Sequence, residues 1–164
     1  YGFINASLKA LGFESLALNW LGDSRYALYA LAVTQVWFHT GQMMVIYVAG
    51  LQQIPQELYE AAQVDGASKW QILRKITLPL LTPSTFFVIV ISLINNFQVF
   101  DQFWVMTDGG PEGATTVILH NIVANSFNYG RMGYASAMSM VLFAIILSIT
   151  LIQLRLQKRW VHYE

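Results

Sequence analysis

Three long apolar segments, residues 26–51, 78–106 and 132–154, constrain most strongly what this 164-residue chain can fold into. A helix needs about 20 predominantly apolar residues to cross the hydrocarbon core of a bilayer, and each segment is long enough. Buried helices of a large soluble protein are the alternative, but three in succession would leave almost no polar surface. Charged residues make up only 11% of the chain, against roughly 25% in an average soluble domain. The sequence therefore predicts an all-α, polytopic membrane protein with three transmembrane helices.

The distribution of Lys and Arg predicts the orientation of these helices. With three crossings, the segment 55–77 and the tail 155–164 fall on one side, and they hold Lys69, Arg74, Lys75, Arg155, Lys158 and Arg159. The other side holds Lys9, Arg25 and Arg131. The excess of positive charge marks the cytoplasmic side. We therefore expect the N-terminal segment to lie outside and the C-terminus to lie in the cytoplasm.

Composition and the first residue narrow the class of protein further. The chain begins at Tyr1 without a signal sequence, so we interpret it as the C-terminal piece of a longer polypeptide. A formal net charge of zero argues against nucleic acid as a partner. The absence of Cys excludes disulfides, thiol redox chemistry and cysteine-ligated metals.

Two segments are expected at the outer surface. Residues 2–24 mix apolar positions with Gly and Asn, which suits a short amphipathic helix and a turn. The outer loop 107–131 begins with TDGGPEGATT, whose Gly and Pro residues break any helix, and continues with VILHNIVANSF, which predicts a short interfacial helix. The part from Asp108 to Thr116 is either a docking region for an outer partner or a simple connecting turn.

The segment between the first two apolar stretches, residues 55–77, is patterned rather than random. Pro55 suits the first turn of a helix, and Gly66 interrupts that helix by a positive φ or by a contact too close for a side chain. Ser68 and Gln71 have the spacing of a capping box that starts a second helix. Pro79 removes a backbone N–H and disfavours helical geometry at Leu78, so we expect the second helix to stop there.

The same segment presents small and acidic side chains at a membrane surface. Ala61 and Ala62 allow close approach, with Glu60 and Asp65 beside them. This pattern predicts a docking surface for another protein, while an amphipathic helix packed on lipid headgroups is the alternative. The physical pattern alone favours neither.

A family resemblance bears on that choice. The segment resembles the coupling motif in permease subunits of binding-protein-dependent ABC importers: Glu-Ala-Ala, three residues, Gly, nine residues, Ile, any residue, Leu-Pro. Every position is filled with the correct spacing, by Glu60, Ala61, Ala62, Gly66, Ile76, Leu78 and Pro79. Other stretches resemble the sugar branch of this family, which is found in maltose, lactose and glycerol-phosphate importers. These stretches are GFINASLKALG, FQVFDQFWVMTDGGPEGATT and GYASAMSMVLFAIILSIT. The family's first spans are missing, so residues 1–164 resemble the C-terminal part of its transmembrane domain.

The resemblance implies a location and a set of partners. It implies a multi-pass protein of a bacterial or archaeal cytoplasmic membrane, surrounded by lipid, which assembles with a second permease subunit. Cytoplasmic ATPase subunits would bind the coupling motif, with Glu60 as its charged anchor, and an extracytoplasmic solute-binding protein would deliver a sugar.

An enzyme and a structural membrane protein are the alternative functions. The chain has no GxxxxGK[ST] loop, so ATP and Mg²⁺ are assigned to the partner ATPase and no cofactor to this chain. His39, His120 and His162 fall in a span, the outer loop and the cytoplasmic tail, so we predict no catalytic residue and no metal site. A structural membrane protein without a transport path remains the alternative.

Two polar stripes at similar depth are candidates for a sugar path. Helical spacing places both sets on single faces of the spans that flank the coupling segment: Gln35, Phe38, His39 and Gln42 on the first, and Ser92, Asn95 and Asn96 on the second. Amides, a hydroxyl, an imidazole and an aromatic ring suit a carbohydrate, which offers hydroxyls and an apolar ring face. Hydrogen bonding between helices without substrate contact is the alternative.

Overall fold

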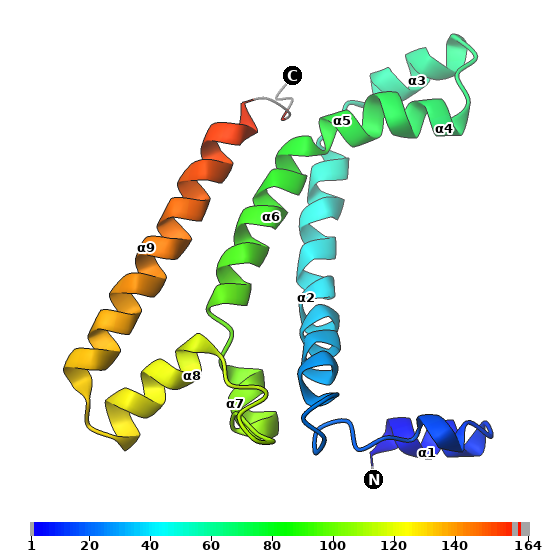
Figure 1. The fold of residues 1–164 in the computed structure, drawn as a ribbon. Helices are drawn as coiled ribbons and strands as arrows, with labels where there is room; N and C mark the ends of the chain where they lie inside the picture. The colour runs from blue at the N-terminus through cyan, green and yellow to red at the C-terminus, as the bar shows by residue number, and fades with distance from the viewer. Residues whose placement is uncertain (1, 159–160, 162–164) are drawn as a thin grey trace.

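The computed structural model describes residues 2–158 and 161, and helices make up its regular structure, with no strand among these residues. Two helices of 26 residues, α2 (Ala27–Gln52) and α9 (Met132–Gln157), flank α6 (Thr82–Phe97) (Figure 1). At 1.5 Å per residue, α2 and α9 are each about 39 Å long, longer than the hydrocarbon core. The predicted all-α fold is confirmed.

The expected spans differ in how well they suit a membrane. Within the described residues, only α9 is by itself long and apolar enough to cross a bilayer, as expected for 132–154. The stretch Lys69–Leu80 joined to α6 passes the same test as a pair bent by 57°. α2 has the length but not the apolar composition, because polar residues such as Gln35, His39 and Gln42 interrupt it. Such a helix needs a protein or water-filled neighbour.

The helix expected across the predicted second span, 78–106, is interrupted near both ends. Its first residues, Leu78–Leu80, form α5, which continues the coupling segment, and α6 begins only at Thr82. At the other end α6 stops at Phe97, and the backbone of Phe100 (φ −147°, ψ −57°) separates it from α7 (Asp101–Thr107). The continuous helix within this segment is therefore α6, with 16 residues, and a break follows it.

The segment 55–77 folds as a helical hairpin that projects beyond the ends of α2 and α6 (Figure 1). Helix α3 (Gln56–Val64) is followed by a turn, by α4 (Lys69–Ile72) and by a π-helical stretch, η2 (Leu73–Thr77). The predicted capping box is confirmed, since Ser68 Oγ accepts from the Gln71 N–H and the Gln71 side chain accepts from the Ser68 N–H. The predicted stop at Leu78 is wrong: its φ of −63° and ψ of −45° are helical.

Short helices cover the opposite end of the molecule. They are α1 (Phe3–Ala10), the 3-10 turn η1 (Glu14–Leu16), α7, α8 (Ile118–Val123) and the π-helical η3 (Ala124–Asn128). The expected helices in 2–24 and 107–131 are thus confirmed, and α7 is an addition. Before α2, the Arg25 guanidinium donates to both Asp23 carboxylate oxygens and lowers the pKa of Asp23 to about 2.

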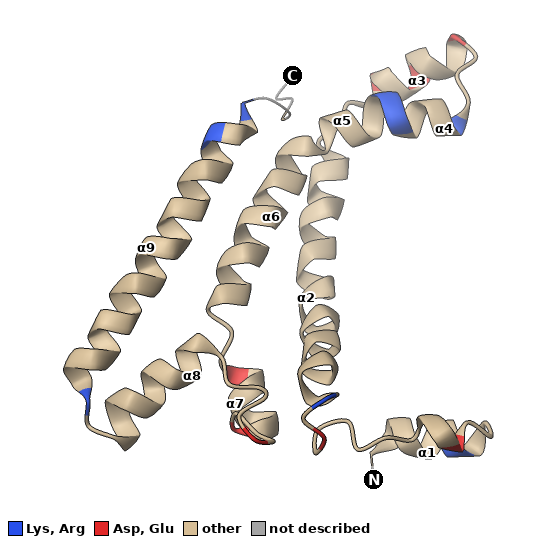
Figure 2. Ribbon diagram, viewed as in Figure 1, with Lys and Arg blue, Asp and Glu red and all other residues tan. Residues whose placement is uncertain are grey.

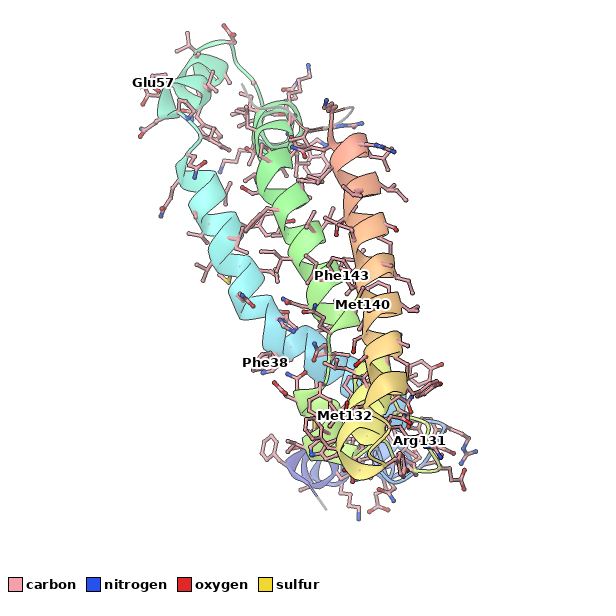
Figure 3. The ribbon with its side chains drawn as sticks, turned by 90° about the vertical axis from the view of Figure 1, so that its left-hand side faces the viewer. Phe38, Glu57, Arg131, Met132, Met140 and Phe143 are labelled. Atoms are coloured by element: carbon pink, nitrogen blue, oxygen red, sulfur yellow. The ribbon has the colours of Figure 1, made fainter. Side chains whose placement is uncertain are left out.

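Charged residues gather at the two ends of the long helices, and the middle is free of Lys, Arg, Asp and Glu in the described part of the chain (Figure 2). Glu57 on α3 and Arg131 before α9 mark these opposite ends (Figure 3). Met140 and Phe143, midway along α9, are 67% and 59% exposed. This distribution of charge and exposed apolar side chains is that of a membrane protein. Arg159, used above to predict orientation, lies outside the described residues.

Candidate functional site

The polar stripe of α2 is built around a pair of side chains, the buried Gln35 and the half-buried His39. Gln35 is 8% exposed, and its Nε2 lies 2.9 Å from His39 Nε2. Because the amide nitrogen can only donate, a neutral His39 accepts on Nε2 and carries its proton on Nδ1. Gln35 Oε1 and His39 Nδ1 are buried without a hydrogen-bond partner among the residues described. One acceptor and one donor therefore remain available, and Phe38 lies edge-on to the imidazole with 5.3 Å between ring centroids.

The polar stripe of α6 faces this pair. Ser92 Oγ donates to Met43 Sδ at 3.7 Å and so links α6 to α2. The Asn96 amide nitrogen donates to the Ser92 carbonyl oxygen of its own helix at 2.6 Å. This bond holds the Asn96 side chain against α6, and Asn96 remains exposed.

Two cavities separate the stripes. A cavity of 510 Å³ lies between α2 and α6, with Gln35, His39, Ser92 and Asn96 in its wall together with Met43 and Tyr47. A second cavity of 500 Å³ lies toward α7, with Gln35, Phe38, His39 and Asn95 in its wall together with Phe100, Asp101 and Gln102. Gln35 and His39 line both cavities, so this pair stands where they meet.

The structure thus brings together all but one residue of the predicted path. Gln42 is exposed and lines neither cavity. The lining of the first cavity follows the row Gln35, His39, Met43 and Tyr47, in steps of four, and Gln42 lies to the side of this row. Continuing that row along the sequence would have found Met43 and Tyr47. The sequence did not point to Asp101 and Gln102 as cavity residues, because both lie inside the predicted span 78–106.

The second candidate site is the outer surface of the coupling hairpin. Glu60, Ala61 and Asp65 are exposed, and Glu60 Oε1 accepts from the Gln56 Nε2 amide at 2.9 Å on the same helix. Exposed apolar side chains accompany them, with Val64 89% and Trp70 68% exposed. Charged and apolar groups on one projecting element can bind a protein partner.

Backbone geometry and one side-chain bond fix the shape of the hairpin. Gly66 has a φ of +75°, which confirms the expected conformation, and a side chain there would meet nothing within 4 Å. The alternative of a close contact at Gly66 is therefore wrong. Tyr59 Oη lies 3.2 Å from Thr77 Oγ1 and joins α3 to η2. Of the remaining motif residues, Ala62 lies near the turn and is half-buried. Ile76 and Pro79, at the base, are half-buried, and Leu78 is exposed.

The outer loop 108–116 is held by internal bonds. Thr115 is 1% exposed, and its Oγ1 donates to the Gly110 carbonyl oxygen at 2.6 Å and lies 2.7 Å from Thr107 Oγ1. His120 Nε2 lies 3.6 Å from an Asp108 carboxylate oxygen, and its ring packs edge-on against Trp104. The loop has a defined shape rather than that of a flexible tether.

The described residues contain no cluster of three or more His, Asp or Glu side chains that could hold a metal ion. His39 lies on α2 and His120 on α8, and His162 lies outside the described part of the chain. The arrangement does not bring His39 and His120 together.

Fold and site define a class: an integral membrane protein with a projecting helical hairpin at one end (Figure 1) and polar-lined cavities beside two of its helices. Residues 3–162 match the family described as "Binding-protein-dependent transport system inner membrane component". The chain belongs to this family, and it is therefore a protein of the cytoplasmic membrane.

Curated relatives are transport permeases. The chain is 42% identical over 155 residues to the trehalose/maltose transport system permease protein MalF of Thermococcus litoralis, covering 94% of this chain and 52% of the relative. It is 39% identical over 156 residues to the sulfoquinovosyl glycerol transport system permease protein SmoG of Agrobacterium fabrum, covering 95% of this chain and 50% of the relative. The chain thus spans about half the length of the curated relatives that it matches.

A solved structure shares the fold. A chain of a bacterial ABC transporter involved in the import of the acidic polysaccharide alginate superposes with a TM-score of 0.83 at 27% identity, covering 96% of this chain and 55% of that one. The same values describe that alginate transporter in complex with a periplasmic protein bound to an alginate pentasaccharide.

Proposed function

We propose that this chain forms part of the permease subunit of an ABC importer, in which it lines the path of a sugar and couples that path to ATP hydrolysis by partner subunits. The observation that carries this proposal is the coupling hairpin. The segment Glu60 to Pro79, which matches the family motif, folds as an exposed helical hairpin whose base continues into both helices of the polar path.

The partners follow from the two ends of the molecule. The hairpin end holds Lys69, Arg74, Lys75, Arg155 and Lys158 and is assigned to the cytoplasm by the positive-inside rule (Figure 2). Cytoplasmic ATPase subunits bind there and hold ATP and Mg²⁺. The loop from Asp108 to Thr116, at the opposite end, contacts an extracytoplasmic solute-binding protein, and a second permease subunit completes the path.

The chemistry of the path supports a polyhydroxylated substrate. Gln35 Oε1 and His39 Nδ1 offer an acceptor and a donor beside the Phe38 ring, and Ser92, Asn95 and Asn96 add further hydrogen-bonding groups. Lipid would penalise these groups, whereas sugar hydroxyls satisfy them. The candidates are a sugar, a related polyol and a glycerol phosphate.

Glu60→Gln in the complete importer tests the coupling role. The substitution keeps the size of the side chain and its ability to accept a hydrogen bond, but removes the charge. If the carboxylate pairs with a basic residue of the ATPase, removing one partner of a buried ion pair costs about 3–5 kcal/mol. We expect the ATPase to dissociate during purification, or its hydrolysis to lose stimulation by the loaded binding protein. Glu57→Gln, on the same exposed helix but outside the motif, is the matched control.

Gln35→Leu and Asn96→Leu test the path in the same assay. We expect both variants to assemble with the ATPase and to lose sugar uptake by about fivefold to a hundredfold, since each removes groups worth about 1–3 kcal/mol and about 1.4 kcal/mol is a factor of ten. Gln42→Leu, which lines neither cavity, is the control and should retain uptake. Normal uptake by all three, with no nucleotide-binding subunit copurifying, would favour the alternative of a structural membrane protein.

A further inference from the structure

The outer cavity contains one charged side chain whose partner is not supplied by the residues described. Asp101 lies at the break between α6 and α7 and forms part of the wall of the 500 Å³ cavity, beside Gln102. Its carboxylate is exposed and forms no ion pair within residues 2–158. The cavity therefore holds a negative charge without an ion-pair partner in its described wall, next to the polar pair Gln35 and His39 and in the first turn of α7, where the helix dipole favours an acidic residue.

The described wall of this cavity holds no cation. Neither cavity has Lys or Arg in its described wall. The three basic residues at this end of the described chain line neither cavity: the Arg25 guanidinium bonds Asp23 at 2.8 Å, the Arg131 guanidinium lies 6.0 Å from the Tyr129 ring centroid, and Lys9 lies on α1. A cavity with low-dielectric walls and charge of one sign focuses the field and changes the local concentration of charged solutes.

The groups of the outer cavity fit one kind of substrate. A carboxylate accepts hydrogen bonds from sugar hydroxyls, and the amides of Asn95 and Gln102 donate and accept. A phosphate, sulfonate or carboxylate group on the substrate would instead meet a like charge with no cation to stabilise it. The alginate transporter with the same fold is involved in the import of an acidic polysaccharide, so the fold alone does not set this preference.

We propose that Asp101 makes the outer cavity exclude anions, so that this subunit passes uncharged sugars or polyols and rejects saccharides that carry phosphate, sulfonate or carboxylate groups. The proposal rests on the proposed function and refines it, because it selects among the candidate substrates. Asp101 acts as a specificity determinant: its charge repels anionic solutes, and its oxygens accept from the hydroxyls of neutral ones.

Thiol labelling of the complete importer measures the electrostatic potential in the outer cavity. Residues 1–164 contain no Cys, so they contribute no background labelling. Gln102→Cys places a thiol in the outer cavity. Its labelling rates are compared for two methanethiosulfonate reagents of similar size, one with a cationic trimethylammonium group and one with an anionic sulfonate. The rest of the importer is first freed of reactive cysteines, and each rate is divided by that of a small thiol in solution.

We expect Gln102→Cys to react at least tenfold faster with the cationic than with the anionic reagent, since a charge roughly 6 Å away at a dielectric constant of about 40 changes a concentration about tenfold. Adding Asp101→Asn should bring this ratio close to one. Thr40→Cys, in the wall of the other cavity where no carboxylate lies, is the control, and its ratio should not respond to Asp101→Asn.

The outcomes separate this inference from the proposed function. Equal rates for the two reagents at Gln102→Cys would overturn anion exclusion while leaving the path in place. A thiol at position 102 that no reagent reaches would count against the path itself and against both proposals. Identification of the transported sugar as an anion in the wild-type importer would also overturn the assignment, whereas a neutral sugar together with the Asp101-dependent ratio supports it.

Discussion

Gly50 sets how closely α2 and α6 approach where both helices meet the hairpin. The residue is buried, and a Cβ built on it would lie 2.1 Å from Ser84 Oγ and 2.9 Å from Ser84 Cβ. Rotating the Ser84 hydroxyl away would not relieve the second contact, because a Cβ moves only with its backbone. Gly50→Ala must therefore push α2 and α6 apart at this point.

The expected cost is that of overpacking a tight contact, typically about 1–3 kcal/mol. In a domain of 150–250 residues each kcal/mol lowers the melting temperature by roughly 2–4 °C, so we expect a loss of roughly 2–12 °C for Gly50→Ala. Gly41→Ala is the matched control, because it changes a glycine of the same helix whose added Cβ would meet nothing within 4 Å. Alanine favours a helix over glycine by about 1 kcal/mol, so the control should be unchanged or more stable.

The assay is thermal unfolding of the purified complete importer in detergent, followed by tryptophan fluorescence and by size-exclusion recovery after heating. A double variant, Gly50→Ala with Ser84→Gly, removes the obstructing atoms and should recover part of the lost stability. Two results would contradict a tight contact at Gly50: a melting temperature of Gly50→Ala equal to that of the Gly41→Ala control, or no rise in melting temperature when the Ser84 side chain is also removed.

Three further predictions concern single residues of the hairpin and the outer loop. Gly66→Val should abolish most uptake without blocking membrane insertion, because a φ of +75° costs a side chain about 1–2 kcal/mol, and Gly66→Asn, which tolerates this conformation better, should retain more uptake. Ser68→Ala should speed amide exchange at residues 69–72, since losing an N-cap costs about 1 kcal/mol. Thr115→Val should speed cleavage of the outer loop by an added protease, because the Gly110 carbonyl loses the donor that the buried Thr115 supplies, at about 1–3 kcal/mol.

The hairpin could be predicted in detail because its signals are local. Gly66 at the turn and the Ser68 and Gln71 pair each act within a few residues, and each has the conformation expected of it. Leu78 does not have the expected non-helical conformation. The reason is also local, but the identities of the neighbouring residues do not reveal it. The Leu78 N–H bonds the Leu73 carbonyl across the π-helical turn, so Pro79 falls in the first turn of α5, where its missing N–H is not needed.

The path was predicted in part, and its errors have tertiary causes. Helical spacing identified Gln35 and His39. The position of α6 decides which other residues of α2 line the first cavity, and Gln42 is not among them. The break after Phe97 contains no Gly or Pro, and the packing of α7 against α2 gives it its shape. Asp101 therefore resembled a charge within a span, although it begins a separate helix at the cavity.

Burial along the hairpin indicates how such an element can transmit force. At its base Ile54, Thr77 and Leu81 are buried, whereas at its tip Val64 is 89% exposed. The base is closed by the Tyr59 to Thr77 hydrogen bond and by the Gly50 contact, so the hairpin and the adjoining ends of α2 and α6 form one packed unit. Close-packed contacts transmit displacement rather than absorb it. Because these two helices carry both polar stripes, a partner that moves the exposed tip changes the spacing of the cavity walls, which is the mechanical requirement for coupling in the proposed importer.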